Sequence, residues 1–296
     1  MGLDTARYHG WHGKLRSPVW SSLALVRVAL LQVFRRKIYW LVLALGFLRF
    51  VVFYVTIYMV TQFTELPPVF REFAFRALDF KASSELGDSG YIRFMDGQSV
   101  VVMILLAFSG SLLVGADFRL GSLPFYLSRR IDRWHYILGK LLAVSVLVSL
   151  VTVVPALVLF IEYGAFTSSF EYWLDNFDVA LSIVGYGAVI AGSLSILLVT
   201  ISAYLERMAP IAVVWSSLFI LLGSFSRLLD RITGYEAWEL LNPWRLIRHT
   251  GRLWFPAFRQ SEDAWLGWWS LFILTVVCTA LLLALFRRVR AVEVVE

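Results

Sequence analysis

Six stretches of the sequence are apolar for long enough to cross a lipid bilayer as helices. A spanning helix needs about 17 to 25 predominantly apolar residues, because the hydrocarbon core is about 30 Å thick. Charged residues make up only 16% of the chain, whereas they form about a quarter of an ordinary globular protein. The sequence therefore predicts an all-α membrane protein, a single transmembrane domain over residues 1–296. The six spans are expected at about Ile38–Thr61, Ser99–Gly115, Ile137–Ile161, Val179–Ser202, Pro210–Ser226 and Ala264–Phe286.

The distribution of basic residues predicts which ends of the spans face the cytoplasm. Lys and Arg gather on cytoplasmic segments close to span ends. With the amino terminus inside, sixteen of the 27 Lys and Arg fall in inner segments and nine in outer loops, with Arg49 and Arg227 in or at spans. We expect a multi-pass protein of the cell (inner) membrane, with membrane lipid around it and both termini in the cytoplasm. The outer loops are expected at 62–98, 162–178 and 227–263.

The first 37 residues are predicted to form a cytoplasmic tail followed by an interfacial helix. Ser17-Pro18 is a typical helix start, with a capping hydroxyl followed by Pro at the first helical position. The stretch from there to Lys37 is too charged to span and is amphipathic, which suits a helix that lies in the plane of the membrane surface. Ser22 is expected on its polar side. The expected apolar side comprises Leu23, Val26, Leu30, Val33 and Phe34.

Two features inside the spans bear on helix packing. Pro155 should kink the third span, because proline removes a helical hydrogen bond. In the fourth span Gly187, Ala191 and Ser195 repeat every four residues, a spacing that lets helix backbones approach closely. We interpret this repeat as ordinary helix packing.

The most informative polar segment is Ala116–Lys140, between the second and third spans. An acid-x-Arg-x-x-Gly-Ser-Leu pattern is followed by Ser-x-x-Ile-x-Arg and Tyr-Ile-x-Gly-Lys, in the residues Asp117, Arg119, Gly121, Ser122, Leu123, Ser128, Ile131, Arg133, Tyr136, Ile137, Gly139 and Lys140. This order resembles the cytoplasmic coupling segment of ABC type-2 permeases, the membrane subunits of type V ATP-binding-cassette exporters. It departs from the family at Ala116 or Asp117, where Glu is usual, and at Arg130, where Pro is usual. By charge alone, an ordinary basic cytoplasmic loop is an equally good interpretation.

The resemblance implies a division of labour between subunits. A separate cytoplasmic ABC ATPase subunit would bind ATP and Mg, so that this chain binds no cofactor and is not itself an enzyme. A second permease copy or a paralogue would complete the pathway. The amino-terminal helix would be a connecting helix that contacts the ATPase, and a coupling helix would lie between the second and third spans. The residues implied to couple to the ATPase are Asp117, Arg119, Gly121, Ser122, Leu123, Arg129, Arg130 and Arg133.

The outer loop between the fifth and sixth spans contains the short element Asn242-Pro243-Trp244-Arg245. This element resembles the outer re-entrant helices of the same permease family, which cap the exit of the pathway. The resemblance implies an outer gate at these four residues. Anchoring of the loop by aromatic side chains at the membrane surface is an equally good interpretation.

Arg49 lies well inside the first predicted span. A guanidinium near the middle of a bilayer costs roughly 2.5 to 3.5 kcal/mol on insertion scales, so it should face the protein interior or a polar pathway. No acid is expected at a similar depth in another span. Backbone carbonyls, the hydroxyls of Ser109 or Ser195, or an anionic group of a substrate remain as partners. Both a structural role and a substrate contact stay open, with the structural role preferred.

Several function classes lack their residues in this chain. The phosphate-binding pattern GxxxxGK[ST] is missing, as are HExxH and G-x-S-x-G, which argues against a nucleotide-binding subunit and against a membrane-embedded enzyme acting on lipid. The only cysteine, Cys278, allows no intrachain disulfide. The net charge of +6 lies near predicted cytoplasmic ends and indicates orientation rather than nucleic-acid binding. We expect an exporter permease subunit. The alternative is a non-transporting scaffold or sensor that binds a partner through its outer loops.

Overall fold

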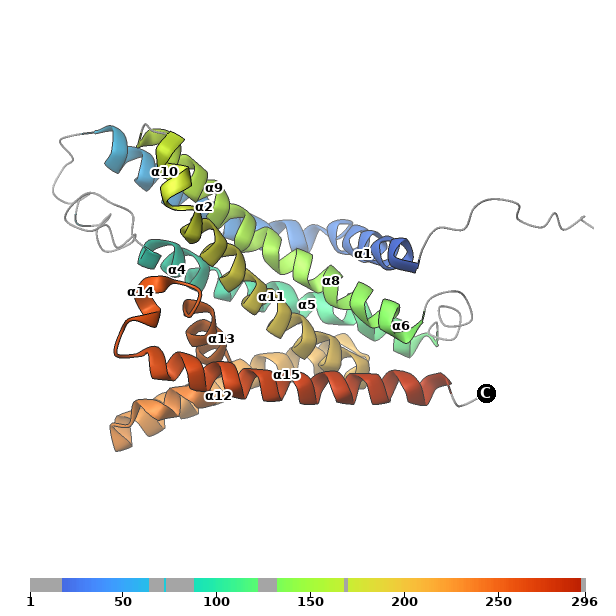
Figure 1. Cartoon of the computed structure of the whole chain (residues 1–296). Coiled ribbons are helices and arrows are strands. Elements are labelled where there is room, and N and C mark those ends of the chain that lie inside the picture. Colours follow the sequence, from blue (N-terminus) through green and yellow to red (C-terminus); the bar gives the residue numbers. More distant parts are fainter. Residues whose placement is uncertain (1–17, 64–71, 73–87, 122–131, 168–169, 294–296) are drawn as a thin grey trace, which may run out of the picture.

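The computed structural model describes residues 18–63, 72, 88–121, 132–167 and 170–293, and all secondary structure in these ranges is helical. Six helical runs within them are long and apolar enough to cross a membrane, which confirms the predicted all-α class and the six candidate spans (Figure 1). The runs are α2 (Lys37–Gln62), Asp88–Arg119, Arg133–Phe166, α11 (Phe177–Leu205), α12 (Met208–Thr233) and α15 (Ala264–Glu293).

The second run is longer than the sequence indicated. It consists of α4 (Asp88–Gly97), α5 (Ser99–Gly110), a π-helical turn η1 (Ser111–Gly115) and α6 (Ala116–Arg119). Residues 88–97, which the sequence assigned to an outer loop, are therefore helical and continue the second run. The polar segment is helical because Tyr91, Phe94 and Met95 are fully buried, and α4 contacts the helices of the third and fourth runs.

The third run breaks where the proline predicts it. Helix α8 (Arg133–Val151) ends at Thr152, and α9 (Val153–Phe166) continues from there with Pro155 in its first turn. Proline has no N–H to donate to the carbonyl four residues before it, here that of Val151. The break three residues before Pro155 confirms the predicted kink.

Helix α11 runs through the middle of the bundle and contacts α8, α12 and α15 (Figure 1). The predicted small-residue repeat lies on its buried side, with Ala191 and Ser195 both in the core. At Gly187 an added Cβ would lie 2.0 Å from Cγ2 of Val153, which is far closer than any van der Waals contact. The glycine therefore allows α11 and α9 to pack closely.

Replacing Gly187 by Val is expected to lower the free energy of unfolding by about 1 to 3 kcal/mol, the usual cost of overpacking a well-packed core. The matched control is Gly192→Val on the same helix, where an added Cβ would have no neighbour within 4 Å. Equilibrium unfolding of the purified protein in mixed detergent micelles measures both changes. Equal stabilities for the two variants would contradict close packing at Gly187.

Helix α1 (Pro18–Phe34) is separate from the first span, because the helix is interrupted at Arg35 and Arg36 before α2 begins. It packs along α8. Its position in the plane of a membrane surface stays a prediction.

The predicted apolar side of α1 was wrong at two positions. Leu23 is 46% exposed, whereas Ser22 is 1% exposed and donates a hydrogen bond of 3.0 Å to the His135 carbonyl. The small residue Gly139 on α8 explains the difference, because a Cβ there would lie only 3.2 Å from the Ser22 carbonyl oxygen. The buried side of α1 comprises Ser22, Val26, Ala29 and Val33.

The predicted outer loop 227–263 is instead a folded helical element. Helix α12 continues seven residues past the predicted end of the fifth span, and the chain then turns at Gly234 with a positive φ of 68°. The element contains η2 (Glu236–Leu241), a 3₁₀ helix, followed by α13 (Pro243–Arg252) and α14 (Pro256–Arg259). Helix α13 contacts α11 and α15, so the element is packed on the bundle.

The segments that the sequence assigned to opposite sides of the membrane lie at opposite ends of the bundle. Helices α1 and α6, the start of α8 and the end of α15 gather at one end (Figure 1). Helices α4, α13, α14 and α10 (Phe170–Asp175) lie toward the other. We refer to them as the predicted inner end and the predicted outer end.

Candidate functional site

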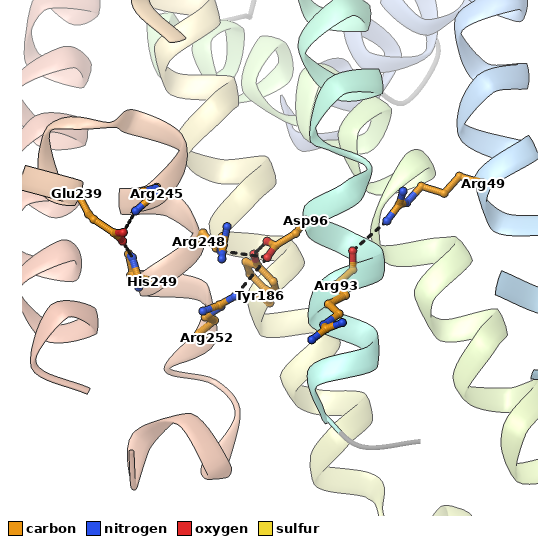
Figure 2. A network of polar contacts seen from close by, with 9 residues as sticks. All are labelled: Arg49, Arg93, Asp96, Tyr186, Glu239, Arg245, Arg248, His249 and Arg252. Carbon is orange, nitrogen blue, oxygen red and sulfur yellow. Dashed lines mark hydrogen bonds and ion pairs between the residues drawn. The ribbon is translucent and has the colours of Figure 1, made fainter. Parts of the chain in front are cut away.

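A carboxylate at the predicted outer end joins three helices. Tyr186 on α11 donates its hydroxyl to Oδ1 of Asp96 on α4, and two arginines of α13 face Oδ2 (Figure 2). Arg248 Nε lies 3.1 Å and Arg252 Nη2 lies 3.5 Å from this oxygen. We call Asp96, Tyr186, Arg248 and Arg252 the Asp96 cluster.

Glycines bring the helices of this cluster close together. An added Cβ at Gly251 on α13 would lie 1.8 Å from the ring of Tyr186. On α11, a Cβ at Gly185 would lie 2.1 Å from the ring of Trp254. Ser182 of α11 also donates to the Trp254 carbonyl over 2.8 Å. The contact between α11 and the outer element is therefore close enough to bury the Tyr186 ring completely.

A second carboxylate lies within the outer element itself. Glu239 of η2 pairs through Oε1 with Arg245, and its Oε2 lies 2.9 Å from Nε2 of His249 (Figure 2). Burial, together with Arg252, Arg248 and Arg245, lowers the pKa of His249 to about 4. Its Nδ1 is buried with no hydrogen-bond partner in the part of the chain that the structure describes. The imidazole is thus neutral at pH 7 and donates from Nε2 to Glu239.

Arg49 contacts a backbone carbonyl, which was one of the alternatives expected from the sequence. Its Nη2 donates to the carbonyl of Arg93 over 3.2 Å, and the guanidinium lies 5.1 Å from the ring centre of Phe53 (Figure 2). Gly97 makes room for it, because an added Cβ there would fall 1.8 Å from Nη2. An acid does act electrostatically on Arg49, namely Asp96 of the second helical run, which the sequence did not indicate.

A third polar cluster lies at the predicted inner end, where the second run reaches α6. Lys140 of α8 is 6% exposed, and its ammonium lies 2.6 Å from Oδ2 of Asp117. The same ammonium donates to the carbonyl of Leu113 in η1 over 2.6 Å, and the Tyr136 hydroxyl donates to Asp117 over 2.9 Å. These contacts tie the start of the segment after the second span to the third span.

The residues implied to couple to an ATPase have different environments. The Asp117 side chain is 15% exposed and held by partners within the chain, whereas Arg119 is exposed. Gly121 has a φ of +62°, which favours glycine and agrees with the turn expected there. Arg133 is partly buried at the first position of α8. Ser122, Leu123, Arg129 and Arg130, together with most of the predicted coupling helix, lie outside the described residues.

The Asn-Pro-Trp-Arg element forms the start of α13. Asn242 is its N-cap and accepts a hydrogen bond of 3.0 Å from the Trp244 backbone N–H, and Pro243 occupies the first turn. Both residues suit a helix start, where backbone N–H groups lack partners within the helix, because Asn242 accepts a hydrogen bond from one of these groups and Pro243 has no N–H. Arg245 faces Glu239. The sequence singled out these four residues as an outer gate but gave neither their role as a helix start nor the Asp96 cluster on the same helix.

Sequence reasoning missed Asp96, Tyr186, Arg248 and Arg252. One signal was present, because Arg245, Arg248 and Arg252 recur at three and four residues and so share one side of a helix. Their acidic partner was hidden in a segment assigned to a loop. Within the described ranges no group of three or more His, Cys, Asp or Glu side chains is placed to hold a metal ion.

Comparison with known proteins identifies no relative of this chain. No family model, no curated protein and no solved structure matches this chain.

Proposed function

We propose that this chain is the permease subunit of an ATP-binding-cassette exporter, and that ATP is hydrolysed on a separate cytoplasmic subunit. The observation that carries the proposal is the arrangement at the predicted inner end. There α1 lies against α8 and η1, directly beside the start of the segment that resembles a coupling segment. A connecting helix and a coupling segment that meet at one end of a six-span bundle would offer a single docking surface to an ATPase.

The inner polar cluster supports a role in transmitting force. Asp117 and Lys140 join the beginning of the segment to the third span through a buried ion pair, and the Leu113 carbonyl adds a contact to the second span. A push on the segment would therefore reach two spans together rather than bend a loose loop. In this proposal Asp117 transmits the movement within the chain and does not contact the ATPase itself.

Six spans would form half of such a transporter, so a second copy or a paralogue completes the pathway. Closure of two ATPase subunits on ATP would press on α1 and on residues 116–133 of each half. Rocking of the halves as rigid bodies would then open the pathway alternately to the two sides of the membrane. The outer element η2–α14 is packed on α11 and α15 and would move with its half.

Capture of an ABC ATPase tests the proposal. The chain is co-expressed with the ABC ATPases of its source cell and purified, and we expect association with one of them and stimulated ATP hydrolysis. The combined change Arg129→Glu, Arg130→Glu and Arg133→Glu should abolish both, because it reverses the charge of the proposed docking segment. The control, Arg231→Glu with Arg259→Glu, reverses charges at the predicted outer end and should change neither.

Two results would contradict the proposal. Undiminished association of the triple variant would reduce the segment to an ordinary basic loop. Failure of the wild-type chain to capture any ATPase would favour the alternative, a scaffold or sensor whose folded outer element binds a partner.

A further inference from the structure

The outer element carries more positive charge than its carboxylates balance. Arg248 and Arg252 on α13 both pair with Asp96, whereas Arg245 on the same side of the helix pairs with Glu239 and is also attracted by Asp230. His249 in the same group is neutral at pH 7, because burial and the three neighbouring arginines lower its pKa to about 4. The Asp96 cluster therefore holds one positive charge in excess, because Arg248 and Arg252 share a single carboxylate.

The two arginines of the Asp96 cluster are also poorly satisfied as hydrogen-bond donors. They share one carboxylate oxygen, and Arg252 reaches it only at 3.5 Å. Arg248 Nε lies 3.1 Å from that oxygen but without hydrogen-bond geometry. Arg252 Nε is buried and likewise has no acceptor among the residues described. A buried donor on a charged group that lacks an acceptor is costly, and native structures usually satisfy it with a water or an ion.

The electrostatics of Arg252 agree with this geometry. Burial and the neighbouring Arg248 both lower its pKa, and Asp96 only partly offsets them. An additional anion beside the two guanidinium groups would relieve both effects. The Arg248 side chain is 35% exposed, so the pair is reachable from outside the bundle.

We propose that Arg248 and Arg252 bind a terminal phosphate group, either a monoester or free phosphate, and that Asp96 occupies the two arginines when no ligand is present. A phosphate offers several acceptor oxygens and more than one negative charge, and guanidinium groups recognise it through paired hydrogen bonds. Asp96 offers both arginines a single oxygen, because its other oxygen accepts the hydrogen bond of Tyr186. The phosphate belongs either to a lipid headgroup at the predicted outer face or to a soluble anion.

Binding of defined probes to the purified chain tests this site. The chain in zwitterionic nanodiscs is titrated by calorimetry with short-chain phosphatidic acid, with short-chain phosphatidylcholine and with inorganic phosphate. Binding of phosphatidic acid alone identifies a lipid headgroup, and equal binding of inorganic phosphate identifies a soluble anion. Binding of none of the three, or equal binding of phosphatidic acid and phosphatidylcholine without binding of inorganic phosphate, overturns the proposal.

Variants separate a binding site from a purely structural cluster. Arg248→Gln and Arg252→Gln should each weaken binding about tenfold, which corresponds to roughly one charged hydrogen bond. Arg259→Gln on the exposed end of α14 is the control and should bind like the wild type. Asp96→Asn should bind about tenfold more tightly, because the competing carboxylate is removed. A structural cluster predicts the opposite, a less stable protein with no gain in affinity.

A second comparison serves if Asp96→Asn does not fold. Arg248→Lys keeps the charge but loses the planar fork, so it should bind more weakly than the wild type. Unchanged affinity of Arg248→Lys and Arg252→Gln would overturn the proposal. These measurements need no ATPase, so they remain decisive even if the chain is not an exporter subunit.

Discussion

Asp117→Asn is expected to lower the free energy of unfolding by about 3 to 5 kcal/mol, the usual cost of removing one partner from a buried ion pair. Lys140 would keep its charge in a site that is 6% exposed, and its neighbours would be the Leu113 carbonyl, the Tyr136 ring at 5.6 Å and the uncharged amide of the new side chain. Reversible unfolding in mixed detergent micelles measures the loss.

The double variant Asp117→Asn with Lys140→Met tests the cause. Removing both charges should restore most of the stability, because no uncompensated charge remains in the core. The control is Glu206→Gln, which breaks the pair with Arg288 at 3.0 Å. About a third of each of those side chains is exposed, so the expected loss is below about 1 kcal/mol. A double variant as unstable as Asp117→Asn would show that the ion pair is not the reason.

Tyr186→Ala is expected to cost about 3 to 5 kcal/mol, since it removes a fully buried aromatic ring between α11 and α13. Tyr186→Phe keeps the ring and loses only the hydroxyl that donates to Asp96, so about 1.5 to 3 kcal/mol is expected. The difference between the two variants measures the packing, and the cost of the Phe variant measures the hydrogen bond.

The same helix offers a control for this comparison. Tyr204→Ala removes a ring that is half exposed, although its hydroxyl donates to the Ala284 carbonyl over 3.2 Å. Its cost should be clearly smaller than that of Tyr186→Ala. Limited proteolysis of residues 234–263 is the second readout, because detachment of the outer element should raise cleavage there in Tyr186→Ala and not in Tyr204→Ala.

Apolar length was enough to predict the six spans, and single residues were enough to predict several details within them. Pro155 marked the break at Thr152, whereas Asn242-Pro243, which had been singled out only for its resemblance to an outer gate, starts α13 with Asn242 as the N-cap. Each of these follows from chemistry that acts within a few residues, namely a missing N–H or a side chain that caps a helix end. Local signals of this kind do not depend on what the helix packs against.

Segments whose structure depends on distant partners could not be predicted in this way. Residues 88–97 are too polar for an apolar run, and α4 forms because Tyr91, Phe94 and Met95 are buried against other helices. The side of α1 that faces the bundle is set by Gly139, more than a hundred residues away in the sequence. Neither contact can be derived from helix propensity or from the periodicity of apolar residues.

The polar clusters illustrate the same limit at the level of sites. Asp117 was expected to face another subunit. It instead pairs with Lys140 within the chain, because the π-helical turn η1 just before it sets the direction in which its side chain points. A backbone carbonyl was one of three kinds of partner expected for Arg49, and the carbonyl that it contacts belongs to Arg93, a residue that the sequence assigned to a loop. The pairing of α13 with Asp96 required the contact between α13, α4 and α11, which no local pattern specifies.

The π-helical turn η1 determines where this part of the chain can lose or gain a residue during evolution. A π-turn closes its hydrogen bonds over one more residue than an α-turn. Deleting one residue from 111–115 would let the turn become α-helical while Asp117 stays on the side that faces Lys140. Adding a residue there, or deleting one elsewhere in α5, would rotate everything beyond it by about 100° around the helix axis. Homologous proteins should therefore tolerate the loss of one residue at this turn, whereas the gain of one residue would separate the Asp117 carboxylate from the Lys140 ammonium.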